Sequence, residues 1–258
     1  MAGGRDHQIG GRTGPAIDLI HAVTTPQQAL VRSAARNNAE WCAVMCRAHG
    51  VASTFEGEAW AAARRTPLYY PDAVTLEPGA DPEALVARID TVSPGASVKD
   101  GFADLDLTGA GFRVLFEAEW IHRPAGVPVT APDLAWDAVR DPDALRDWAR
   151  AWDDGGGHAD LFRPGLLGDP QTFLLAGRSA DGRVAVGAVA GRSSDVVGVS
   201  NVFGPPNVAW PLVLHAVGRL FPALPVVGYE QGDDLTAALR HGFEAVGPLR
   251  VWVHERPA

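Results

Sequence analysis

One helix-like spacing in this chain could bring metal ligands together, that of Cys42, Cys46 and His49. They stand at positions i, i+4 and i+7, so on a helix they share one face, and thiolate and imidazole groups are ligands that zinc prefers. No second ligand pair is visible in the sequence, and the neighbouring Val44 and Met45 fit a buried helix stripe. We therefore expect these side chains to lie in a core and predict no metal site.

Asp104 and Asp106 are a pair of carboxylates with a spacing that could serve acid–base catalysis. They flank Leu105, so in an extended chain both carboxylates would point the same way, as paired carboxylates do in acid–base catalysis. Such a pair is more often a solvated face or turn, which is the interpretation we adopt. The histidines are scattered, and no Ser-His-Asp or Cys-His order stands out.

Composition disfavours several functional classes. The chain has 258 residues, of which 47% are apolar, so it can bury one large core or two modest ones. Its 22 basic and 31 acidic residues give a net charge of −9, which repels nucleic acid and anionic lipid alike. We therefore predict neither nucleic acid nor a membrane as partner. The two cysteines on one helix and the polar first fifteen residues predict a cytoplasmic protein.

The N-terminal part of the chain shows one strong helix signal. Thr25-Pro26 is a helix start and Gly50 a helix stop, which predicts a long helix over residues 25–49. A second helix is expected over residues 55–65. Residues 112–122 alternate between apolar and polar side chains well enough to be a strand.

Residues 124–132 are the best linker candidate, because four prolines or glycines in nine positions interrupt helices and central strands. The strand at 112–122 could belong to either side of this linker. We predict a flexible head, an N-terminal α/β region, the linker and a C-terminal domain, over residues 1–15, 16–123, 124–132 and 133–258.

Beyond the linker the expected elements follow one another closely. Asp141-Pro142 opens a helix, and the Asp181-Gly182 pair favours a tight hairpin. Near the end, Gly242-Phe243 follows a helix and precedes a last strand. The predicted order is a helix from 141, strands at 172–177, 184–191 and 196–203, a helix at 207–220, a strand from 226, a helix and a final strand.

The succession from Phe112 to His254 resembles the GCN5-related N-acetyltransferase (GNAT) family, and the residues ALRHGFEAVG at 238–247 are similar to its Gly-Phe turn. This resemblance implies an α/β (α+β) fold with a mixed, centrally splayed sheet flanked by helices. The N-terminal part would be an α/β extension or a degenerate copy. In the family two strands separate to leave a V-shaped cleft for the pantetheine arm of acetyl-CoA. Residues 199–203 and 226–230 would line that cleft here.

The resemblance also implies residues that would bind acetyl-CoA, or another acyl-CoA, as co-substrate. In the family a loop rich in N–H groups holds the pyrophosphate before a helix. Of the six corresponding residues, 204–209, only Ala209 keeps the family pattern, and Pro205 and Pro206 have no N–H. Backbone N–H groups at the end of the preceding strand would polarise the thioester carbonyl. The predicted cofactor-binding residues are Val202, Phe203, Gly204, Asn207, Val208 and Ala209.

The catalytic residues are the least constrained part of the resemblance. The family's tyrosine four residues before the Gly-Phe turn is Ala238 here, so Tyr229, another side chain or solvent would protonate the departing thiolate instead. Glu230, at the cleft edge, is the first candidate for the base that removes the amine proton, and Glu119 is the second. Either carboxylate could instead be a solvated strand-edge charge.

The function that the resemblance implies is an acyl-CoA-dependent N-acyltransferase, with acetyl as the expected acyl group. The acceptor would be a small-molecule or peptide amine, and the sequence is compatible with a homodimer. The alternative is a non-catalytic member of the fold that binds a ligand or a protein and has lost the usual CoA loop.

Two segments of the chain are similar in sequence, which bears on how its domains are organised. The residues from Gly111-Phe112 to Pro124-Ala125 resemble those from Gly242-Phe243 to Pro257-Ala258, with single-residue gaps. Either the first segment opens the C-terminal domain, or it ends a degenerate first copy of that domain. Chance similarity over so short a span is the third explanation.

Overall fold

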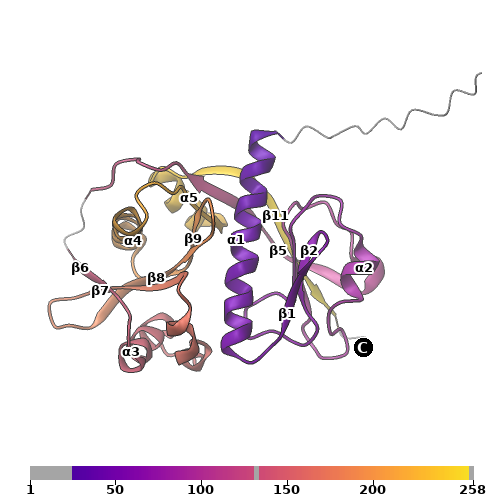
Figure 1. The fold of residues 1–258 in the computed structure, drawn as a ribbon, viewed down its shortest axis with the longest axis horizontal. Coiled ribbons are helices and arrows are strands. Elements are labelled where there is room, and N and C mark those ends of the chain that lie inside the picture. Colours follow the sequence, from indigo (N-terminus) through magenta and orange to yellow (C-terminus); the bar gives the residue numbers. More distant parts are fainter. Residues whose placement is uncertain (1–24, 131–133, 256–258) are drawn as a thin grey trace, which may run out of the picture.

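The computed structural model describes residues 25–130 and 134–255, which form one open mixed sheet with helices on both faces (Figure 1). The predicted head at 1–15 and the last two residues of the predicted linker lie outside the described residues. The strands lie in the order β1-β2-β3-β4-β11-β5-β10-β9-β8-β7-β6. Their bounds are β1 Ser53–Glu56, β2 Ala59–Ala62, β3 Ala73–Thr75, β4 Ser97–Asp100, β5 Phe112–Arg123, β6 Ala135–Ala138, β7 Thr172–Arg178, β8 Val184–Arg192, β9 Val197–Phe203, β10 Val226–Glu230 and β11 Glu244–His254. The helices are α1 Pro26–Ala48, α2 Pro82–Val86, α3 Pro142–Asp153, α4 Pro206–Leu220 and α5 Gly232–Arg240, with 3-10 turns at Thr108–Ala110, Ala159–Leu161 and Pro164–Gly168.

Helix α1 forms as predicted because its first turn carries a capping box. The Gln28 N–H donates to the Thr25 hydroxyl at 3.2 Å, and the Thr25 N–H donates to the Gln28 side chain at 3.1 Å. Gly50, at a φ of 71°, follows the end of the helix. In Figure 1 this helix crosses the middle of the sheet, and it contacts strands from both parts of the chain, β3 and β11 as well as β9 and β10.

The second helix expected over residues 55–65 is wrong. Strands β1 and β2 form an antiparallel hairpin there, with Glu56 opposite Ala59, and Gly57 takes a positive φ of 56° in the turn. β2 has the sequence AWAA, and all four of its residues are buried. Close packing on both faces of the strand, rather than helix propensity, explains the small side chains.

Successive residues of one strand show how the helices divide between the two faces. Leu174 of β7 packs in a cluster with α1 and α3, whereas its neighbour Leu175 packs in a cluster with α4 and α5. In the N-terminal part, Trp60 lies on the α1 face and Ala61 on the face that α2 covers. Helices α1 and α3 therefore cover one face, and α2, α4 and α5 cover the other.

The centre of the sheet is built from strands of both parts of the chain. β5, from before the predicted linker, lies between β10 and β11 and is antiparallel to each. β11, the last strand, lies between β5 and β4. Each part of the chain therefore places its last strand inside the other part's half of the sheet. The predicted class, a mixed sheet flanked by helices, is confirmed.

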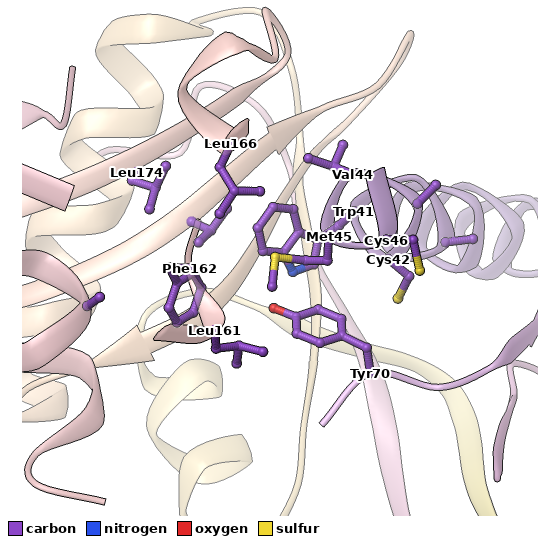
Figure 2. Close-up of a cluster of buried hydrophobic side chains, with 14 of the residues drawn as sticks. Trp41, Cys42, Val44, Met45, Cys46, Tyr70, Leu161, Phe162, Leu166 and Leu174 are labelled. Atoms are coloured by element: carbon purple, nitrogen blue, oxygen red, sulfur yellow. The ribbon is translucent and has the colours of Figure 1, made fainter. Parts of the chain in front are cut away.

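The largest core cluster gathers around α1 (Figure 2). Trp41, Met45 and Tyr70 lie together there, with Leu161 and Phe162 reaching them from the other part of the chain. The residues labelled in Figure 2 are buried or nearly so, and they join α1 to the 3-10 turn that follows α3. This core therefore fixes the position of α1 over the sheet.

Both cysteines belong to the same core. Burial raises the pKa of the Cys42 thiol to about 11 and that of Cys46 to about 12. Metal ions bind the thiolate, which this environment disfavours. His49 places its Nε2 2.8 Å from the Leu161 carbonyl oxygen. Within residues 25–130 and 134–255, no group of three His, Cys, Asp or Glu side chains could hold a metal ion.

Candidate functional site

The parallel strands β9 and β10 separate at the centre of the sheet. They pair at two positions, Val197 with Val226 and Gly198 with Val227, and no further pairing joins them in the described chain. β10 nevertheless continues to pair with β5 as far as Glu230. Gly228 follows the last of these pairs, and a Cβ there would lie only 3.0 Å from the Val199 carbonyl oxygen, so glycine allows the close approach of the two strands just before they separate. The predicted central splay is confirmed.

An extra residue in β9 accounts for the separation. Phe203 pairs with Gly187 and Ser200 with Val189, so three steps along β9 match two along β8. Such a bulge bends its strand, and here it turns the end of β9 away from β10. Asn201, inside the bulge, has a φ of 53°, a left-handed conformation that asparagine tolerates better than most residues.

The predicted cofactor-binding residues form one arm of this opening. Phe203 packs edge-on against Trp148 on the α1 and α3 face, with ring centroids 5.1 Å apart. Val202 and Val208 pack against the core under α4 and α5. Val202 and Phe203 therefore lie at the open end of β9, at the point where the chain turns into α4.

The turn into α4 leaves few N–H donors. Gly204 has a φ of 95°, and a Cβ there would lie 2.7 Å from the Ala185 carbonyl oxygen, so only glycine fits. The N–H groups of Val208 and Ala209 donate to the Pro205 carbonyl at 2.9 and 2.8 Å. Within the described chain no group accepts from the exposed Asn207 N–H. This helix end can therefore offer one free first-turn donor to an anion.

Glu230 and Glu119 are brought together, directly opposite each other on β10 and β5. They line a cavity of about 370 Å³ at the end of β10, together with Glu117 and Arg250, which form an ion pair at 2.9 Å. Burial, and secondly the charge of Asp234, raise the pKa of Glu230 to about 7. A carboxyl group with this pKa can both accept and release a proton near neutral pH.

Tyr229 points to the opposite face, because alternate residues of a strand do so. Its ring lies under α1, 5.8 Å from the ring of Trp120 and 3.9 Å from the Lys99 ammonium nitrogen. Lys99 is 3% exposed and donates to the Asn38 side chain at 2.8 Å. In the described residues no carboxylate forms an ion pair with it. Tyr229 and Glu230 therefore cannot act on the same atom from one side of the sheet.

Tyr70 is a further polar residue at this opening. Its hydroxyl donates to the Asn201 side chain at 3.4 Å, so a residue from before the predicted linker meets the bulge of β9. Burial raises the Tyr70 pKa well above its ordinary value, and the phenol therefore stays protonated. The loop that carries it also places Tyr69, at a positive φ of 70°, against Trp152.

Lys99 and Tyr70 were missed from the sequence. One signal could have found Lys99, because it is the only lysine among 22 basic residues. At every other basic position the chain uses arginine, which stays charged when buried, whereas lysine is a compact donor that can lose its proton. Tyr70 carried no comparable signal.

The remaining predicted groups have structural roles. Ala238 of α5 is fully buried against the core under α4 and α5, and the hydroxyl of the nearby Thr236 donates to the Gly232 carbonyl of the same helix. Asp104 accepts from the Gly79 N–H, and Asp106 accepts from the Thr108 N–H and hydroxyl. Both carboxylates hold turns. In the described part of the chain no helix is both long and apolar enough to cross a membrane.

Comparison with known proteins gives a clear result for the fold. No protein-family model and no curated protein matches the sequence. A GCN5-related N-acetyltransferase from Kribbella flavida is similar in structure, at 16% identity and a TM-score of 0.58, over 87% of this chain and 96% of that chain. A protein assigned to the GNAT acetyltransferases from Novosphingobium aromaticivorans DSM 12444 matches at 14% identity and 0.54, over 86% and 99%. A conserved protein of unknown function from Staphylococcus epidermidis ATCC 12228 matches at 11% and 0.51, over 68% and 77%.

Proposed function

We propose that this chain, which has the fold of the GCN5-related N-acetyltransferases, is an acyltransferase that moves an acyl group from acyl-CoA to an amine. Acetyl is the expected acyl group. The observation that carries the proposal is the opening between β9 and β10, which begins after two residue pairs and ends beside Glu230. A fold alone does not imply an activity. An opening next to a carboxyl group with a pKa of about 7 does support one, because a substrate could bind in the opening and exchange a proton with that group.

The residues along β9 and α4 fit the co-substrate in part. The bulge exposes the end of β9 for the pantetheine arm, and the Asn207 N–H at the start of α4 suits a phosphate oxygen. Pro205 and Pro206 remove donors from that turn, so we expect weaker binding of the pyrophosphate than a glycine-rich turn would give. When bound, acyl-CoA would supply the activated acyl carbon. The backbone at Val202 and Phe203 would face its carbonyl oxygen.

Glu230 would act as the proton acceptor for the amine. Because its pKa is about 7, a large fraction is ionised at neutral pH, and it stays basic enough to take a proton from an ammonium group. Glu119, directly opposite, would help to hold the cationic amine. Tyr229 is on the other face, fixed by Lys99, and stays a candidate proton donor for the leaving sulfur.

We also propose that the N-terminal part is a degenerate copy of the C-terminal part. Strands β3 and β4 are parallel, are joined through a helix and pair at two positions, as β9 and β10 do. Beyond those pairs the Gly101 N–H donates to the Thr75 hydroxyl at 2.7 Å, which bridges the gap. The similarity between the sequences around Phe112 and Phe243 also supports this proposal, because it joins β5 and β11, the two neighbouring strands that end the two parts of the chain.

Thermal unfolding with acetyl-CoA tests the proposed function. A ligand at 100 times its dissociation constant adds about 2.7 kcal/mol to the free energy of unfolding. For a chain of this size that raises Tm by roughly 5–10 °C. We expect such a shift with acetyl-CoA, and release of free CoA thiol when an amine acceptor is added.

Two outcomes would go against this function. No shift at millimolar acetyl-CoA would exclude acyl-CoA binding, and a shift without thiol release for any amine would favour a non-catalytic ligand-binding module. A cytoplasmic location and a homodimer remain parts of the proposal that fractionation and gel filtration would test.

A further inference from the structure

Part of the central strand β5 has an edge that no described strand pairs. β10 pairs with β5 from Arg123 to Glu119 and then ends, whereas β11 pairs with the other edge as far as Phe112. Residues 113–118 of β5 therefore extend beyond β10 with one edge unpaired in the described chain. The side chains of Val114 and Leu115 are 38% and 50% exposed there.

This edge is short and leads directly to the candidate site. A register shift between Val114 and Phe116 leaves Leu115 as a bulged residue, so the regular edge is limited to Phe116, Glu117 and Ala118. The cavity of about 370 Å³ lies against this stretch and ends at Glu119 and Glu230. A strand placed here would continue the line of β10.

We propose that the edge of β5 at residues 116–118 binds the first residues of an extended peptide, and that the acyl acceptor is the α-amine of that peptide. This inference rests on the acyl transfer proposed above. Exposed strand edges are the usual site at which a peptide adds to a sheet, through main-chain hydrogen bonds. A peptide antiparallel to β5 would run in the same direction as β10, so its N-terminus would lie at Glu230.

The charges of the cavity fit that orientation. Arg250 neutralises Glu117, which leaves Glu119 and Glu230 to face an ammonium group. An α-amine has a pKa of roughly 7.7–8.0, against about 10.4 for a lysine side chain, so it gives up its proton far more readily to a group like Glu230. The chemistry therefore favours a peptide terminus over a lysine side chain.

The reaction balances with the groups named. The amine nitrogen bonds to the acyl carbon, the carbon–sulfur bond breaks, and its electron pair leaves with the CoA sulfur. Before this attack the ammonium group gives one proton to Glu230, which passes it to solvent. After the attack the nitrogen loses a second proton, again to Glu230 and solvent, and the CoA thiolate takes up one proton from Tyr229 or from solvent. No oxidant or metal is needed.

Backbone-methylated peptides give a direct test. The probe is the hexapeptide Ala-Val-Thr-Val-Ser-Gly with a free N-terminus, acetyl-CoA is the donor, and CoA thiol release and peptide mass are measured. Two matched peptides carry an N-methyl group on the amide of residue two or of residue three. Because hydrogen bonds alternate along a strand edge, we expect one of the two to raise KM at least tenfold and the other to raise it much less.

Equal KM values for all three peptides would overturn the proposal. So would a kcat/KM for 1,4-diaminobutane as high as that for the parent hexapeptide. In both cases, release of CoA thiol and a rise in Tm with acetyl-CoA would still support the proposed acyltransferase activity, so only the proposal about the peptide acceptor would be rejected. An N-acetylated hexapeptide serves as the control, and we expect no reaction with it.

Discussion

Glu230 is partly buried at the end of β10, and burial, followed by the charge of Asp234, raises its pKa to about 7 from an ordinary value of 4.5. The folded protein therefore holds this proton more tightly than the unfolded chain. The contribution to stability is fully present below the unfolded pKa, and it is lost as the pH rises through about 7. The same burial that lowers stability at pH 8 gives the carboxyl group a pKa suited to proton transfer.

Replacing Glu230 by Gln should separate these two effects. Glu230→Gln removes the buried charge, so we expect the free energy of unfolding to rise by roughly 1–3 kcal/mol at pH 8 and to change little at pH 4. We expect kcat/KM for acyl transfer to fall about 100-fold or more, because no base replaces the carboxylate. Chemical denaturation at the two pH values and steady-state kinetics measure both effects.

Glu58→Gln, at an exposed position in the turn between β1 and β2, is the matched control and should alter neither property. A pH–rate profile adds a second check, because the wild-type rate should rise with pH through about 7. If Glu230→Gln kept that rise in rate, another group would be the base.

The residues of the site differ in how far the sequence could predict them. The sequence predicts Glu119 and Glu230 as candidate bases on two strands, and the antiparallel register of β5 and β10 places them opposite each other. Lys99 and Tyr70 lie in segments with no motif, and they reach the site only because the two parts of the chain share a sheet. Contacts of such long sequence separation leave no local pattern.

At the level of elements, the first turn of α4 decides how an anion could bind. Pro206 is the first residue of this helix, and it has no N–H where an anion-binding turn would offer one. Pro211 lies further along the same helix and is also without an N–H. The two prolines therefore form a natural pair for comparison.

Pro206→Ala should strengthen acyl-CoA binding. The new N–H adds a hydrogen bond to a charged phosphate oxygen, and we expect a dissociation constant about 3- to 10-fold lower. Pro211→Ala should leave that constant unchanged, since its N–H would bond within the helix. Isothermal titration with acetyl-CoA measures both, and equal constants for Pro206→Ala and wild type would place the phosphates elsewhere.

Elements with strong end signals were predictable, and those shaped by packing were not. The Thr25 and Gln28 side chains close the first turn of α1, so this helix could be predicted within a residue or two at each end. Residues 55–65, predicted as a helix, form β1 and β2 instead, because tertiary packing rather than local propensity decides their conformation. The splay could be expected only from the family resemblance, since the bulge at Asn201 has no sequence signature.

In the whole molecule, the exchange of β5 and β11 ties the two parts of the chain together. Without β5, strands β10 and β11 would lose their shared neighbour, and without β11 the strands β4 and β5 would lose theirs. Helix α1 packs over strands of both parts and closes the same core. We therefore expect one cooperative folding unit.

Cutting the chain between Ala125 and Gly126, at an inserted protease site in this exposed turn, should leave the two pieces associated. They should elute together in gel filtration and unfold in one calorimetric transition. Residues 126–258 expressed alone should show no cooperative transition, because β5 is absent. An isolated C-terminal piece with the wild-type Tm would show instead that the parts fold independently.

The burial of Lys99 affects how readily acyl-CoA could modify this protein chemically. Thioesters slowly modify accessible lysine amines without any catalyst, and a protein working among them is exposed to this damage. This chain has one lysine, and it is 3% exposed under α1. Its surface therefore offers arginine guanidinium groups instead of lysine amines, which keeps the folded protein resistant to self-acylation by the donor it is proposed to use.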